Sequence, residues 1–134
     1  MRVVDYRPAI DRVLKHYGLM PESLKLVPDV QDWCEENCPD TTEVSGSRPA
    51  IFIRSKTGVF HIVMRETLSR QTFAGLKYVM RRRGFGDQVK MLRSERLCLL
   101  HLLLHEIAGY VLDATDQDPR DTWAFQEMTN HSYF

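Results

Sequence analysis

The spacing of apolar and polar residues changes along this chain, and each spacing predicts a helix or a strand. The longest apolar run covers residues 99–112, which are rich in Leu, contain no Pro and exceed the length of a strand. Apolar side chains cover nearly the whole circumference of this run, which is typical of a helix buried at the centre of a domain. Ser94 is the predicted N-cap, so we expect a central helix from about Glu95 to Leu112.

Two shorter apolar runs upstream have the character of strands. Residues 50–54 and 59–64 are rich in β-branched and aromatic side chains, and residues 55–58 between them have the composition of a turn. The pattern predicts a β-hairpin. We therefore expect an α+β fold that is mainly helical, with the central helix packed under a small sheet that contains this hairpin.

The remaining helices are predicted from the residues that begin and end them. Proline favours the first helical position, Ser, Thr and Asp cap helix N-termini, and Gly ends helices. The expected helices begin at Pro8, after Asp29, after Thr67 or Ser69, and at Pro119 after Asp118, and the first and third end at Gly18 and Gly84.

Further interpretations concern the third and last of these helices. The third should turn Phe73, Leu76, Val79 and Met80 inward. Packing of the last helix against the central helix should bring Asp121, in its first turn, near His105. Residues 41–48 have the composition of a loop, and the tail from residue 129 to residue 134 is expected to be loosely held.

Composition and charge exclude several classes of protein. The 134 residues, 43% hydrophobic and 27% charged, predict a single domain, residues 1–134, with its own core. Basic and acidic residues number 18 each, which gives no overall attraction to nucleic acid or anionic membranes. The N-terminus turns polar before a signal segment forms, and three cysteines are an odd number for a disulfide framework. These observations favour a cytoplasmic protein without a membrane span, since the run at 99–112 is too short to cross a bilayer.

The charges are unevenly distributed along the chain. Residues 65–96 contain nine Lys and Arg against three Asp and Glu, whereas residues 29–43 and 113–127 are acidic. Arginines 81–83 fall in the last turn of a predicted helix, where cations complement the helix dipole. A surface that binds nucleic acid is an alternative explanation of the basic segment. The sequence has neither interleaved aromatic residues nor a helix-turn-helix signature to support it.

The central helix carries three residues that could bind a metal or take part in catalysis. His101 and His105 are four residues apart, the spacing with which a helix can present two zinc ligands. Glu106 follows His105, as the general base follows the first histidine in HExxH, but Gly109 stands where the second histidine belongs. The pair His101 and His105 therefore does not form an HExxH motif with Glu106. A carboxylate in so apolar a run needs a partner, a raised pKa or an opening to solvent, so we expect a groove beside Glu106.

The amino-acid sequences of two segments resemble those of a known superfamily. Residues 103–112, with His105-Glu106, and residues 121–125 resemble the zincin-like metallopeptidases, closest to the small bacterial ImmA/IrrE-like type, with a degenerate HExxH motif. The resemblance implies a buried active-site helix followed by a second helix that supplies an acidic third ligand, here Asp121. It also implies a peptide lying antiparallel to the edge strand of the sheet.

Three functional hypotheses follow from these patterns. The first is a zinc-dependent hydrolase with unusual ligation, in which His101, His105 and Asp121 bind zinc and Glu106 activates water. The second, which we prefer, is a zincin-like domain that has lost catalysis and binds a peptide or protein partner in its groove. The third is a nucleic-acid-associated regulatory protein. Structural use of the two histidines, satisfied by neighbouring polar groups, is the alternative to metal binding.

Other metal-binding or site residues are less well supported by the sequence. Cys34 and Cys38 are four residues apart but have no further Cys or His near them in the sequence. His61 is interpreted as an ordinary strand residue.

Overall fold

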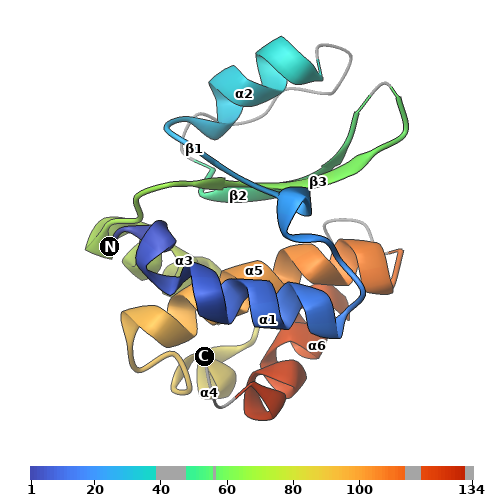
Figure 1. The fold of residues 1–134 in the computed structure, drawn as a ribbon. Helices are drawn as coiled ribbons and strands as arrows, with labels where there is room; N and C mark the ends of the chain where they lie inside the picture. Colours follow the sequence, from blue (N-terminus) through green and yellow to red (C-terminus); the bar gives the residue numbers. More distant parts are fainter. Residues whose placement is uncertain (39–47, 56, 114–118, 132–134) are drawn as a thin grey trace.

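The computed structural model describes residues 1–38, 48–55, 57–113 and 119–131. Within these residues a small sheet lies over a layer of helices, which gives the predicted α+β architecture (Figure 1). The predicted loop at 41–48 and the predicted cap Asp118 lie wholly or mostly outside the described residues. The elements are α1 (Arg7–His16), β1 (Leu24–Val27), α2 (Val30–Asn37), β2 (Ala50–Arg54), β3 (Phe60–Arg65), α3 (Arg70–Arg82), α4 (Gly86–Val89), α5 (Glu95–Val111) and α6 (Pro119–Glu127).

The sheet has the strand order β1-β3-β2. The predicted hairpin is confirmed, because β2 and β3 pair antiparallel with Phe52 opposite Ile62. Strand β1 was not predicted, and it pairs parallel to β3 with Leu24 also opposite Ile62. A strand of four residues gives too little alternation to be seen in the sequence, and its partner lies far along the chain.

The two faces of the sheet are covered by different parts of the chain. Ala50, Ile62 and Met64 pack into the main hydrophobic core with the helices below the sheet. Ile53 and Val63, which point the other way, form a second cluster with residues of α2. The sheet is thus a layer between α2 and the main helical core (Figure 1).

Helix α5 is the predicted central helix. Ser94 is its N-cap, with a hydroxyl that accepts a hydrogen bond of 3.2 Å from the backbone N–H of Leu97. Buried residues run from Cys98 to Gly109 around nearly the whole helix, and Val111 is its last residue. None of the described helices is long and apolar enough to cross a membrane.

A close contact between α5 and β2 explains the glycine at position 109. A Cβ atom on Gly109 would lie 2.6 Å from Cδ1 of Phe52, and real Cβ atoms do not approach so closely. The Phe52 ring therefore occupies the space in which a side chain at position 109 would begin. Gly109 is required by packing, and a histidine there would displace the ring.

Helix α3 buries a narrower face than the sequence predicted. Ser69 is its N-cap, and Phe73 and Met80 are buried as expected. Leu76 packs partly against the core, whereas Val79 is 42% exposed, so its predicted inward position is wrong. The helix meets the core through one line of side chains, and Val79 lies beside that line.

The prediction of a loosely held tail is wrong for its described part. His131 is buried, and its Nε2 lies 3.1 Å from the hydroxyl of Tyr17, which also donates a hydrogen bond to Glu127. Residues 128–130 form a short 3-10 turn that leads into this contact. Residues 132–134 lie outside the described part.

The Gly109–Phe52 contact predicts opposite effects of alanine at two helical glycines. Gly109→Ala should lower the free energy of unfolding by on the order of 1 kcal/mol, because overpacking outweighs the better helix propensity of alanine. Gly75→Ala in α3 is the matched control, since a Cβ there meets no atom within 4 Å. It should raise stability by about 0.5–1 kcal/mol. Urea unfolding followed by circular dichroism measures both, and a Gly109→Ala variant as stable as the native chain would contradict the packing argument.

Candidate functional site

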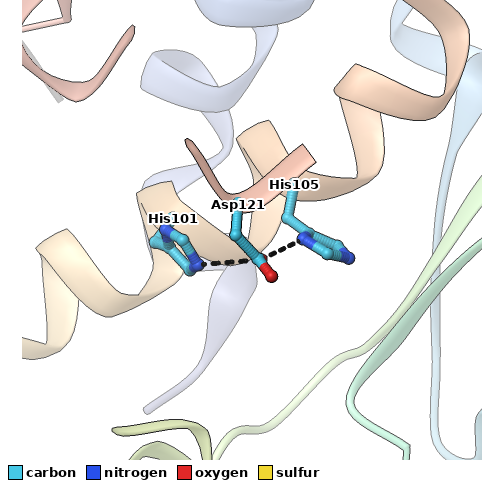
Figure 2. Close-up of side chains that lie close together, drawn as sticks. All are labelled: His101, His105 and Asp121. Carbon is cyan, nitrogen blue, oxygen red and sulfur yellow. Dashed lines mark hydrogen bonds and ion pairs between the residues drawn. The ribbon is translucent and has the colours of Figure 1, made fainter. Parts of the chain in front are cut away.

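Two helices bring the candidate ligands together. His101 and His105 lie one turn apart on α5, and Asp121 lies in the first turn of α6. Figure 2 shows the Asp121 carboxylate between the two rings. The expectation that Asp121 approaches His105 is therefore confirmed, and His101 joins the same cluster.

The two histidines contact the same carboxylate oxygen at different distances. His105 Nδ1 lies 2.6 Å from Oδ1 of Asp121, which is a short hydrogen bond. His101 Nε2 lies 3.7 Å from the same oxygen, beyond the length of a hydrogen bond. The other oxygen, Oδ2, accepts a hydrogen bond of 3.0 Å from Nη1 of Arg83.

His101 is the least satisfied member of the cluster. It is fully buried, and neither ring nitrogen has a hydrogen-bond partner among the described residues. Its ring packs on Phe125 with 4.4 Å between the ring centroids. Burial lowers the pKa of His101 against the opposing effect of Asp121, so the ring is neutral and has a free lone pair.

Asp121 is ionised in spite of its burial. Burial by itself would raise the pKa of this carboxyl, but the hydrogen bond with His105 and the interactions with both His101 and His105 outweigh it and hold the pKa well below its usual range. The guanidinium of Arg83 also pairs with this carboxylate at 3.0 Å. The cluster therefore presents a carboxylate and a neutral imidazole at one point.

This donor set could hold a metal ion. His101, His105 and Asp121 each offer one donor atom, and these atoms all lie within 4.8 Å of one another. Tetrahedral zinc with bonds of about 2.0 Å places its ligand atoms about 3.3 Å apart, close to the 3.7 Å separation at His101. The 2.6 Å hydrogen bond between His105 Nδ1 and Asp121 Oδ1 is shorter than that, so it would have to open for these two atoms to bind one metal ion. The unpartnered nitrogens of His101 are the observation that fits a metal best.

Glu106 lies between the cluster and a buried arginine, since its Oε1 is 3.8 Å from Nε2 of His105. Its Oε2 accepts a hydrogen bond of 3.0 Å from Nη2 of Arg120, and both side chains are 4% exposed. Nε of Arg120 also donates to the backbone carbonyl of His105. The partner expected for this buried carboxylate is thus a buried arginine, which the sequence had not indicated.

The groove expected beside Glu106 is present. It has a volume of about 840 Å³ and lies between the start of β2, helix α3 and the middle of α5. Leu102 and Glu106 contribute to it from α5, and Arg48, Arg65 and Arg83 line its other sides. Nε of Arg65 is buried there without a hydrogen-bond partner among the described residues. The groove is therefore rich in positive charge.

Three groups in this region were missed by sequence reasoning. Arg83 lies within a run of three arginines, so nothing in the sequence singles it out. Arg120 has one available signal, its position next to Asp121 at the start of a helix that packs on α5. Phe52 could be anticipated only as a strand residue, because its contact with Gly109 depends on how the sheet meets α5.

The other candidate residues lie away from this cluster. Cys34 and Cys38 are buried in the hydrophobic cluster around α2, and burial raises the pKa of both thiols. The group of possible metal ligands found among the described residues does not include them. His61 lies on the α2 side of the sheet, with its ring centroid 5.5 Å from that of Trp33. All three therefore have structural positions.

Comparison with known proteins does not assign a family to this chain. No protein-family model matches this chain, and neither the curated proteins nor the solved structures contain a match. The resemblance to zincin-like metallopeptidases therefore stays a prediction.

Proposed function

We propose that this chain is a zincin-like domain without hydrolase activity, and that it binds an extended peptide segment of a protein partner in the groove between β2 and α3. The observation that carries the proposal is the buried ion pair between Glu106 and Arg120. A general base must be free to take a proton from water. Glu106 is instead held by a buried guanidinium beside an open groove.

The surroundings of Gly109 also support a role without catalysis. The resemblance would assign the second histidine of a zinc site to this position. The ring of Phe52 fills the space beside it, so a histidine there would have to displace the ring. The chain therefore has the groove that the resemblance implies, but position 109 cannot supply the second histidine ligand.

Strand β2 supports the peptide as the class of partner. It is an edge of the sheet within the described residues, and Ser55 N donates to Val59 O at the end of its ladder with β3. Because bonded pairs alternate in an antiparallel ladder, the N–H and C=O groups of Phe52 and Arg54 point toward the free edge. An extended peptide can pair with such groups.

The charges of the groove favour an acidic peptide. Arg48 and Arg65 line it, whereas the charges of Arg83 and Glu106 are balanced by Asp121 and Arg120. A guanidinium recognises a carboxylate with paired hydrogen bonds. We therefore propose that the bound segment carries Asp or Glu side chains.

Zinc is the metal that we propose for His101, His105 and Asp121. Two imidazoles and one carboxylate are common zinc ligands, and three protein ligands leave one position open. A bound zinc ion would supply Lewis-acid chemistry at that position. The unpartnered nitrogens of His101 favour the alternative of a zinc-dependent hydrolase with unusual ligation, which the experiments below distinguish.

The peptide proposal predicts that filling the groove weakens binding. Short random peptides displayed on phage should yield binders enriched in Asp and Glu. Gly75→Leu, at a groove residue whose Cβ meets no atom within 4 Å, should weaken these peptides about tenfold or more. Ala74→Leu on the neighbouring face of α3 is the control and should leave binding unchanged. No enrichment of acidic peptides, or equal losses in both variants, would count against the proposal.

Glu106→Gln separates a structural role from a catalytic one. The amide keeps the shape but leaves Arg120 without its counter-charge, so the free energy of unfolding should fall by about 1–3 kcal/mol. Glu36→Gln, on the exposed side of α2, should change it by less than about 0.5 kcal/mol. The zinc-treated native chain should not cleave a peptide library. Cleavage that Glu106→Gln abolishes at unchanged melting temperature would establish the hydrolase alternative instead.

Zinc titration tests the ligand set. The native chain should bind one zinc ion in competition with a chromophoric chelator, and its melting temperature should rise, because zinc binds the folded state. His101→Ala and Asp121→Asn should each abolish this binding. His61→Ala is the control, since His61 lies on the other face of the sheet, and it should bind zinc like the native chain. No zinc binding by the native chain would assign the cluster to structure alone.

A further inference from the structure

A second basic surface lies on the opposite side of α3 from the groove residue Arg83. A hollow of about 580 Å³ opens between α3 and the N-terminus of α5. Four cations line it, and Glu95 is its one carboxylate among the described residues. These cations are Arg70, Lys77, Arg81 and Arg93.

The cations of this hollow differ from the others in the way they are paired. Arg7, Arg83, Lys90 and Arg120 each lie within 4.0 Å of a carboxylate. Within the described residues, no such ion pair is formed by the four cations of the hollow. Their charges are therefore available to a ligand.

Two of these cations lie where the helix dipole opposes them. Arg70 is the first residue of α3, and Arg93 directly precedes Ser94, the N-cap of α5. The N-terminus of a helix carries a positive partial charge, so cations are disfavoured there. A bound anion would relieve both repulsions, and it could also accept hydrogen bonds from the first N–H groups of the seventeen-residue helix α5.

The spacing of the cations points to a chain of anions. Arg70, Lys77 and Arg81 are seven and four residues apart, so they follow one face of α3. They extend over roughly 16 Å at 1.5 Å per residue. A single phosphate group is shorter than this row, whereas a row of linked phosphates can contact all of it.

An exposed aromatic residue adjoins the row. Tyr78 is 59% exposed, and its neighbour Arg82 places a guanidinium carbon 5.8 Å from the ring centroid. The hydroxyl of Tyr78 accepts a hydrogen bond of 3.3 Å from Nη1 of Arg82, which holds the ring in place. An exposed ring beside a row of cations is the arrangement on which unpaired bases stack.

We propose that this face binds single-stranded nucleic acid, with Arg70, Lys77, Arg81 and Arg93 contacting successive phosphates and Tyr78 stacking on a base. The site is separate from the groove, and its argument does not depend on the proposed peptide function. The absence of a helix-turn-helix signature in the sequence agrees with a single strand as the ligand, because no recognition helix is needed.

The test is fluorescence anisotropy of labelled oligo-dU and oligo-U, which differ only in the sugar, with the full chain. Binding should weaken as salt rises from about 50 to about 200 mM, with a slope of log K against log salt near −3 for four phosphate contacts at about −0.7 each. Equal affinities for the two oligonucleotides indicate readout of phosphates and bases alone. A preference for one sugar identifies it as the ligand, and both results support the site.

Variants locate the binding on this face. Lys77→Glu and Arg81→Glu should each weaken binding about tenfold or more, whereas Lys15→Glu on the exposed side of α1 makes the same change in net charge and should have a far smaller effect. Tyr78→Ala should weaken binding by about fivefold or more without changing the salt slope, because stacking releases no counterions. All four residues are partly or fully exposed, and unchanged melting temperatures check the folding of the variants.

Several outcomes would overturn the proposal. These are no oligonucleotide binding at about 50 mM salt, an equal loss in Lys15→Glu and Lys77→Glu, or an unchanged affinity in Tyr78→Ala. Binding of a phosphorylated peptide in place of either oligonucleotide would also overturn it, and would assign the hollow to a protein ligand.

Discussion

The structure depends on the way in which α5 satisfies its buried polar side chains. Glu106 is nearly inaccessible to solvent in the most apolar helix of the chain, and an unsatisfied polar group there costs about 1–3 kcal/mol. The first turn of α6 supplies partners from consecutive residues, Arg120 for Glu106 and Asp121 for His105, whereas His101 lies 3.7 Å from Asp121 without a hydrogen bond. Neighbouring residues on a helix are about 100° apart, so two adjacent positions of α6 match the adjacent positions His105 and Glu106 of α5. This match fixes the packing of the two helices more narrowly than apolar contact does.

The two carboxylates of the cluster differ in how freely they can change partner. The side chain of Arg83 is 40% exposed, so it can leave Asp121 for water at low cost. The side chain of Arg120 is 4% exposed, and separating it from Glu106 would leave a buried charge. Asp121 can therefore exchange Arg83 for a metal ion at lower cost than Glu106 can leave Arg120, which supports the proposal of a domain without hydrolase activity. Metal binding by Asp121 therefore does not require that Glu106 act as a base.

The sequence predicted those features that depend on short-range signals. The caps Ser69 and Ser94, the hairpin and the buried central helix follow from local composition and periodicity, and the approach of Asp121 to His105 follows from the start of α6 at Pro119. Strand β1 was missed because it pairs with β3 from a distant part of the chain. Long-range contacts in the site were missed for the same reason. The Phe52 ring against Gly109, and the arginines at Glu106 and Asp121, are contacts between segments that no spacing along the sequence can show.

The distribution of cations on α3 is better explained by two surfaces than by the helix dipole alone. The dipole accounts for arginines in the last turn, where Arg81 and Arg82 lie. It cannot account for Arg70 in the first turn, where the same dipole is unfavourable. Arg83 pairs with Asp121 beside the groove, and Lys77 and Arg81 line the hollow on the other side. The one helix thus separates an arginine that is used inside the protein from cations that form no ion pair within the described residues, and this difference supports the proposal that the outer row binds a ligand.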